Sequence, residues 1–129
     1  MPAILILDDE PVACDSLRIL LQSLKKWDVE TAVTPTQALN SAMTRPPDLF
    51  VVDWNLGAEI NGLQVADAVR KIRPGLPVIV MTGYPSDEIY RQSTALPRTW
   101  LIGKPCPYHE LLGAIEDALR SVEQEKNSG

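Results

Sequence analysis

The sequence is poor in the residues on which several classes of protein depend. Its 129 residues include one histidine and two cysteines, Cys14 and Cys106, which form no CxxC pair. A zinc site is therefore disfavoured, and we expect both cysteines to be reduced thiols in a cytoplasmic protein. Aromatic residues make up 5% of the chain, which weakens the case for a surface that stacks on nucleic-acid bases.

Positive charge and long apolar runs are also scarce. Twelve Lys and Arg face 17 Asp and Glu, for a net charge of -5, and this argues against a groove for nucleic acid. The balance suits a protein that binds cations or basic partner surfaces. No apolar run approaches the roughly 20 residues that span a bilayer. The start, Met1-Pro2-Ala3, also lacks the basic region of a signal peptide. We expect a cytoplasmic protein without membrane contact.

The chain does contain a repeated alternation of apolar runs and helix-like stretches. At 45% hydrophobic and 129 residues it can bury the core of one domain. Continuous or β-branched apolar runs predict strands at residues 3–7, 28–33, 49–53, 77–81 and 99–102. A helix-like stretch follows each run, and the last is expected over Tyr108–Val122. Five strands alternating with five helices predict an α/β fold with a parallel sheet and right-handed crossovers.

The expected helices begin at recognisable signals and have apolar faces. Pro11 opens the first, and Thr34 and Ser86 cap the second and fourth. The inward residues of the first helix are expected to be Ala13, Leu17, Leu20, Leu21 and Leu24, with Cys14 at its surface. Ile89 and Ala95 form the weak inward face of the fourth. We expect a domain over residues 1–122, followed by a polar tail at 123–129.

Polar residues follow four of the five expected strands. Asp8 and Asp9 follow the first, Asp53 ends the third, Thr82 ends the fourth and Lys104 follows the fifth. In open parallel sheets the ligand lies beyond the carboxyl ends of the strands. We therefore expect these side chains to share one rim of the sheet.

The chemistry of this set favours a phosphate and a magnesium ion. Three converging carboxylates stay ionised only when a cation joins them, and oxygen ligands favour Mg²⁺ over Zn²⁺. Lys104 offers a positive charge and Thr82 a hydroxyl donor, while Gly83 leaves space. Asp53 can act as a nucleophile and form an acyl phosphate. Taken singly, the acids could be helix-start charges and the lysine a surface residue; together they indicate a site.

Four segments carry a resemblance to a known family. They are Leu5-Ile6-Leu7-Asp8-Asp9-Glu10, Val51-Val52-Asp53, Val80-Met81-Thr82-Gly83 and Lys104-Pro105. From about Ala3 to Val122 the sequence resembles the receiver domain of two-component response regulators. The resemblance implies a flavodoxin-like, doubly wound (βα)5 sandwich with a parallel five-stranded sheet in the order 2-1-3-4-5.

The resemblance also implies a role for each site residue. Asp53 would accept a phosphoryl group from a phosphohistidine on a histidine kinase or a histidine phosphotransfer protein. Asp9 would bind Mg²⁺ directly, Asp8 mainly through water, and Asn55 through its backbone carbonyl. Thr82 would move toward the phosphate and Lys104 would pair with it, and the Lys104-Pro105 bond would be cis.

The chain departs from the common pattern in three places. The loop at 55–62 lacks the usual proline and is expected to be one residue longer. Leu101 stands where an aromatic residue is usual, and its neighbour Trp100 either replaces that residue or only packs. Tyr84 either shields the phosphate or is a half-exposed loop tyrosine.

Our interpretation is a phosphorylation-switched signalling module, not an enzyme beyond its own phosphorylation and dephosphorylation. The face made by the fourth helix, fifth strand and fifth helix would meet a downstream protein, without direct DNA contact. The chain would be a single-domain regulator or a receiver from a larger or hybrid kinase protein. A phosphoester hydrolase would want an acid where Asn55 stands. A phosphate-independent interaction module with the same fold is the other alternative.

Overall fold

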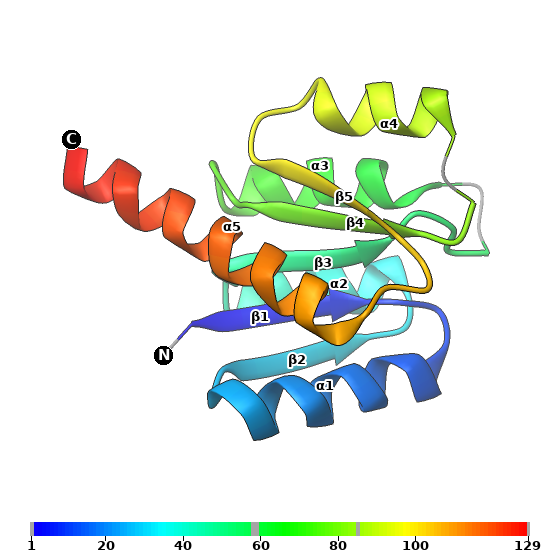
Figure 1. Ribbon diagram of the computed structural model, residues 1–129, viewed down its shortest axis with the longest axis horizontal. Coiled ribbons are helices and arrows are strands. Elements are labelled where there is room, and N and C mark those ends of the chain that lie inside the picture. Colours follow the sequence, from blue (N-terminus) through cyan, green and yellow to red (C-terminus); the bar gives the residue numbers. More distant parts are fainter. Residues whose placement is uncertain (1, 58–59, 85, 129) are drawn as a thin grey trace.

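The five expected strands form one parallel sheet in the computed structural model, which describes residues 2–57, 60–84 and 86–128, with 123–128 as backbone only. The sheet order is β2-β1-β3-β4-β5 (Figure 1). The strands are β1 (Ala3–Leu7), β2 (Asp28–Ala32), β3 (Leu49–Asp53), β4 (Val78–Thr82) and β5 (Thr99–Gly103). The helices are α1 (Pro11–Lys25), α2 (Pro35–Thr44), α3 (Gly62–Ile72), α4 (Asp87–Thr94) and α5 (Tyr108–Ser128). The predicted fold class and strand order are confirmed.

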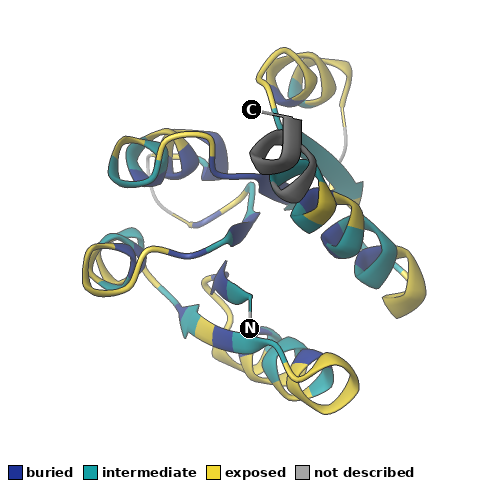
Figure 2. Cartoon of the chain, turned by 90° about the vertical axis from the view of Figure 1, so that its left-hand side faces the viewer, coloured by how far each residue is buried: buried dark blue, intermediate teal, exposed yellow. Residues whose placement is uncertain are grey.

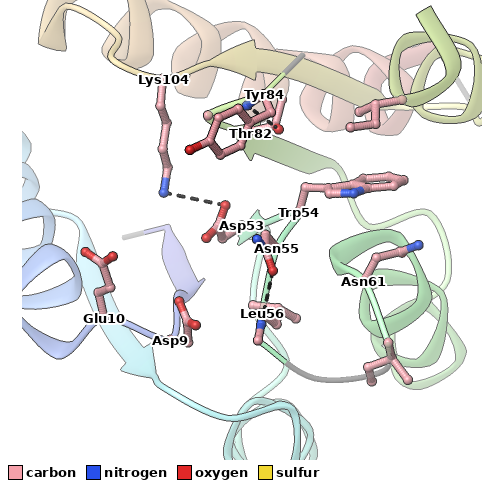
Figure 3. A pocket seen from close by; sticks show the side chains of 14 residues that line it. Asp9, Glu10, Asp53, Trp54, Asn55, Leu56, Asn61, Thr82, Tyr84 and Lys104 are labelled. Atoms are coloured by element: carbon pink, nitrogen blue, oxygen red, sulfur yellow. Dashed lines mark hydrogen bonds and ion pairs between the residues drawn. The ribbon is translucent and has the colours of Figure 1, made fainter. Parts of the chain in front are cut away.

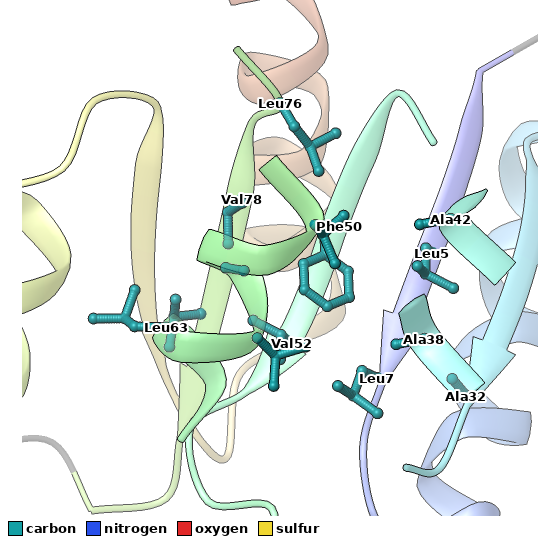
Figure 4. Close-up of a cluster of buried hydrophobic side chains, with 14 of the residues drawn as sticks. Leu5, Leu7, Ala32, Ala38, Ala42, Phe50, Val52, Leu63, Leu76 and Val78 are labelled. Atoms are coloured by element: carbon teal, nitrogen blue, oxygen red, sulfur yellow. The ribbon is translucent and has the colours of Figure 1, made fainter. Parts of the chain in front are cut away.

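Apolar side chains on the two faces of the sheet build two cores. Because side chains alternate along a strand, Leu5 and Leu7 of β1 face α2 and α3, whereas Ile4 and Ile6 face α1 and α5. Phe50 lies at the centre of the first core, fully buried (Figure 4). The helices on both faces explain why the strands read as continuous apolar runs rather than alternating ones.

Local signals position the helices. Pro11 occupies the first turn of α1, and the Thr34 side chain accepts a hydrogen bond from the backbone N–H of Gln37 at the start of α2. Asn61 and Gln64 form a reciprocal capping box at the start of α3. The predicted Ser86 cap of α4 is confirmed, with its Oγ 3.2 Å from the Ile89 nitrogen. No helix in these described ranges has both the length and the apolar composition needed to cross a bilayer.

The inward face of α1 differs from the prediction. Cys14, predicted at the surface, is 1% exposed, whereas Leu24, predicted inside, is 55% exposed. Cys14, Leu17 and Leu21 are spaced three and four residues apart and share the buried face. A reduced thiol packs as a small apolar group, so polarity was a poor guide there. Leu24 continues the spacing but belongs to the last turn of the helix.

Two further predictions were wrong, one about the inward face of α4 and one about the end of α5. Ala95 is the C-cap of α4 and is exposed, and Ser93 takes the inward position four residues after Ile89. The last helix continues past Val122 to Ser128, because Glu, Gln and Lys favour helix despite their polarity. The division between a domain at 1–122 and a tail at 123–129 stays a prediction.

Candidate functional site

Three carboxylates meet at the carboxyl edge of the sheet. Asp8 and Asp9 follow β1, and Asp53 is the last residue of β3, the strand that pairs with β1. One oxygen from each lies within 4.8 Å of the others. Asp8 is buried, with 9% of its surface exposed, Asp53 is partly buried and Asp9 is exposed. The predicted convergence of these acids is therefore what the tertiary structure produces.

Lys104 reaches this acidic cluster from the end of β5 (Figure 3). Its Nζ lies 3.0 Å from Asp8 Oδ2 and 3.5 Å from Asp53 Oδ1. Its backbone N–H donates to the Thr82 carbonyl at 2.7 Å, which fixes the start of the loop after β5. The Lys104-Pro105 bond is cis, as the resemblance implied. Lys104 is thus paired more closely with Asp8 than with Asp53.

Burial and mutual contact shift the pKa values of the central pair. Burial raises the pKa of Asp53, the negative charge of Asp8 raises it further, and Lys104 opposes both. Burial lowers the pKa of the Lys104 ammonium, but its contacts with Asp8 and Asp53 outweigh this, so the pKa lies above its ordinary value. One ammonium faces three carboxylates, so the site carries excess negative charge and suits a further cation.

Thr82 and Gly83 complete the rim at the end of β4. Thr82 is almost fully buried, and its Oγ1 accepts a hydrogen bond from the Tyr84 backbone N–H at 3.1 Å. The hydroxyl keeps its own hydrogen to donate. A Cβ added to Gly83 would meet no atom within 4 Å. The space predicted beside Thr82 is present.

Two glycines allow the loop after Asp53 to fold against the site. Gly62 donates to the Trp54 carbonyl at 3.0 Å, and a Cβ there would overlap the carbonyl oxygen of Asp53. Gly57 has a φ of 66°, and a Cβ would lie 3.1 Å from Asp9 Oδ2. The sequence does not reveal these roles, because close approaches between segments far apart in the chain leave no local pattern.

The loop itself is only partly described. The side chain of Asn55 accepts a hydrogen bond from the Gly57 N–H at 3.2 Å, and Asn55 pairs with Asn61 in an isolated bridge. The predicted extra residue falls in a loop that includes Ala58 and Glu59, which lie outside the described residues. The loop length therefore stays a prediction, as do the roles of the site residues.

A pocket of about 650 Å³ opens over the acids. The residues that line it include the polar Asp9, Asp53, Thr82 and Lys104 and the apolar or aromatic Trp54, Ile60, Tyr84 and Ile89. Figure 3 shows the pocket from close by. Trp54 borders the pocket directly after the end of β3. Tyr84 is 83% exposed although it borders the pocket, and shielding of a phosphate by its ring stays a prediction.

Trp100 and Leu101 lie on opposite faces of β5. Trp100 pairs with Ile79 and packs against the core beneath α1 and α5. Leu101 pairs with Val80 and packs against the other core. Of the two alternatives for Trp100, the structure favours packing, because its ring is on the wrong face to replace a side chain at position 101.

The sequence and fold match known proteins over most of the chain. The family model described as "Response regulator receiver domain" matches residues 4–116. The methanol utilization control regulatory protein MoxX of Paracoccus denitrificans is 26% identical over 118 residues, 91% of this chain and 53% of that protein. The photosynthetic apparatus regulatory protein RegA of Cereibacter sphaeroides is 31% identical over 114 residues, 87% of this chain and 59% of that protein. The chain thus spans about half the length of these relatives.

Solved structures match more completely. A response regulator receiver domain protein (CheY-like) from Methanospirillum hungatei JF-1 has a TM-score of 0.87 and 30% identity, covering 97% of this chain and 98% of that one. The non-phosphorylated HemR receiver domain from Leptospira biflexa has a TM-score of 0.82 and 27% identity, covering 92% and 94%.

Proposed function

Since this chain belongs to the response regulator receiver domain family of two-component systems, we propose that it is a switch whose phosphoacceptor is Asp53. The phosphoryl group would come from a phosphohistidine on a histidine kinase or a histidine phosphotransfer protein. The observation that carries this proposal is the placement of Asp53 at a strand end, within 4.8 Å of two further acids and 3.5 Å from Lys104.

The chemistry at Asp53 is a single transfer. A carboxylate oxygen attacks phosphorus, an O–P bond forms, and the P–N bond to the imidazole breaks. The imidazole leaves with the electron pair and takes up a proton. The partly buried position of Asp53 limits water around the acyl phosphate that results. Asn55, two residues on, provides no second acid for a phosphoester hydrolase.

The donors present fit a magnesium ion. Asp9, Asp53 and the backbone carbonyl of Asn55 would hold it, and the bare Gly57 beside Asp9 leaves the exposed carboxylate accessible. Asp8 is already engaged through both oxygens, by the Glu10 N–H at 3.0 Å and by Lys104 at 3.0 Å. This supports a role for Asp8 mainly through water. Bound Mg²⁺ would supply positive charge that offsets charge on the phosphoryl oxygens.

Lys104 and Thr82 respond to the new phosphoryl group. The ammonium of Lys104 would leave Asp8 and pair with a phosphoryl oxygen, a stronger anion at the same rim. The hydroxyl of Thr82 would turn to donate to another oxygen. Either movement changes the loops that follow β4 and β5, and so biases a two-state equilibrium.

The proposed output is the face made by α4, β5 and α5. A downstream protein would bind this face, and the chain itself would make no direct DNA contact. Its catalysis would be limited to its own phosphorylation and dephosphorylation, in the cytoplasm. Relatives named as transcriptional regulators are longer than this chain, so a single-domain regulator and a receiver from a larger or hybrid kinase both remain proposals.

The test is adduct formation. The protein is incubated with Mg²⁺ and acetyl phosphate and its intact mass is measured. We expect one phosphoryl adduct in the wild type and in the surface control Asp117→Asn, and none in Asp53→Asn. Continuous release of phosphate from unrelated esters would point instead to a hydrolase. Absence of both adduct and Mg²⁺ binding would indicate a phosphate-independent interaction module.

A further inference from the structure

Helix α4 is only lightly attached to the rest of the molecule. It is eight residues long and packs against β5. Its surface is exposed along most of its length, as the top helix of Figure 2 shows. Ser93 is its fully buried residue, at 0% exposure, and Ile89 is partly buried. A serine therefore occupies the centre of the seam where α4 meets the sheet.

The hydroxyl of Ser93 is unpaired. Among the residues that the structure describes, its Oγ is buried and has no hydrogen-bond partner. The next residue, Thr94, satisfies its own hydroxyl by donating to the Tyr90 carbonyl at 2.7 Å. A buried hydroxyl without a partner costs free energy, and alanine at the same position would not. The packing of α4 on the sheet is thus less stable with serine at position 93 than it would be with alanine.

Thr82 holds the backbone at Tyr84, three residues before α4 begins. The Tyr84 N–H donates a hydrogen bond to Thr82 Oγ1. In the proposed function the Thr82 hydroxyl turns toward a phosphoryl oxygen. Because a hydroxyl can donate and accept at once, we take the side chain to rotate about Cα–Cβ, which moves Oγ1 away from the Tyr84 N–H and releases the backbone at Tyr84.

The segment between α4 and β5 is held by a side chain from another helix. Arg70 of α3 donates from Nη2 to the carbonyls of Pro97 and Arg98, at 2.8 and 3.0 Å, and to Thr99 Oγ1 at 3.0 Å. These contacts fix the segment that leads from α4 into β5. The chain on either side of α4 is therefore held differently: Tyr84, before the helix, is bonded to Thr82, and residues 97–99, after it, are bonded to Arg70.

We propose that Ser93 is a positioning residue for the switch. Its unpaired hydroxyl weakens the packing of α4 on β5, so that the helix is displaced more readily, relative to the Arg70-bound segment 97–99, when Thr82 turns to the phosphoryl group. This inference rests on the proposed function of Asp53. An unsatisfied buried hydroxyl is worth about a factor of ten in a conformational equilibrium, so Ser93 keeps the displaced position within reach.

The test compares wild type, Ser93→Ala and the exposed control Ser23→Ala. Hydrogen–deuterium exchange of the α4 amides is measured without phosphodonor, together with the urea midpoint. The rate of adduct formation with acetyl phosphate and Mg²⁺ is then measured. We expect Ser93→Ala to slow α4 exchange about tenfold, to raise the midpoint and to slow adduct formation several-fold. The control should match wild type in α4 exchange and in the rate of adduct formation, and its urea midpoint should rise only by the small gain in helix propensity that alanine brings.

A higher urea midpoint together with slower adduct formation distinguishes this role from a purely structural one. Ser93→Cys keeps the shape of the side chain but needs no hydrogen bond, so it should behave like Ser93→Ala. It serves as the second variant if the alanine variant fails to fold. Unchanged or faster α4 exchange in both variants would overturn the proposal. A raised urea midpoint with an unchanged rate of adduct formation would overturn it as well. Failure of wild type to form any adduct would instead refute the function at Asp53, and the exchange measurement would still report on the packing of α4.

Discussion

Gly62 provides the sharpest quantitative test of how the site is built. It is the first residue of α3, and its N–H donates to the Trp54 carbonyl at 3.0 Å. An alanine Cβ would overlap the Asp53 carbonyl oxygen and lie 3.1 Å from the carbonyl carbon and 3.2 Å from Val52 Cγ2. Backbone atoms cannot yield as a flexible side chain can. Either α3 or the end of β3 must move.

The expected cost follows from these contacts. Overpacking against rigid neighbours typically costs about 1–3 kcal/mol. The backbone of Gly62 needs no left-handed conformation, so alanine recovers part of this by restricting the unfolded chain, about 0.4–1 kcal/mol. A net loss of about 1–2 kcal/mol lowers the urea midpoint by about 0.5–1 M, for an m-value near 2 kcal/mol/M. Adduct formation at Asp53 should fall as well, because its backbone is displaced.

Urea unfolding followed by circular dichroism measures the effect, with Gly113→Ala as the matched control. Gly113 lies within α5, and an added Cβ there meets no atom within 4 Å. The same chemical change should therefore stabilise that position by about 0.5–1 kcal/mol. If Gly62→Ala proves as stable as wild type, the close approach of α3 to Asp53 is wrong.

Three other perturbations probe the site and its supports. Lys104→Met removes the cation from the buried Asp8 and the partly buried Asp53, and should cost about 2 kcal/mol of unfolding free energy in EDTA. This is below the range for fully buried pairs because the Lys104 side chain is 33% exposed, and added Mg²⁺ should restore part of the urea midpoint. Iodoacetamide should label Cys106 and spare the buried Cys14 until urea is added. Because burial raises the pKa of the Cys106 thiol, the labelling rate of Cys106 should keep rising with pH in the range where an ordinary thiol is already fully ionised. Equal labelling of both thiols in the native protein would contradict this. Asn61→Ala removes the α3 cap and should cost about 1 kcal/mol in urea unfolding.

Local chemistry written along the chain determined the elements and their order. The apolar runs before Asp8, Asp53 and Thr82 predicted three strands, because a strand buried on both faces cannot alternate with polar residues. Pro11, Thr34 and Ser86 marked helix starts. The first N–H groups of a helix have no partner within the helix, so proline, which lacks an N–H, fits there, and a Thr or Ser side chain can accept a hydrogen bond from one of them. Parallel strands bring their carboxyl ends to one edge, so the rim of acids, threonine and lysine could be inferred as well.

Packing decided which residues of a helix are buried. Cys14 lies inside and Leu24 outside, although hydrophobicity alone ranks them the other way. Burial depends on where the sheet ends beneath the helix and on the volume left there. The same holds for Ser93, which is buried because its position, and not its polarity, faces β5.

Tertiary structure alone decided the contacts between distant segments at the site. Lys104 lies closer to Asp8 than to Asp53, and Gly62 abuts the Asp53 carbonyl. Ångström-scale distances of this kind arise from how β1, β3 and β5 are set side by side with their loops. The sequence could therefore name the charged groups at the rim, because residue type and strand position are local properties. Which oxygen each group meets is a property of the packed whole.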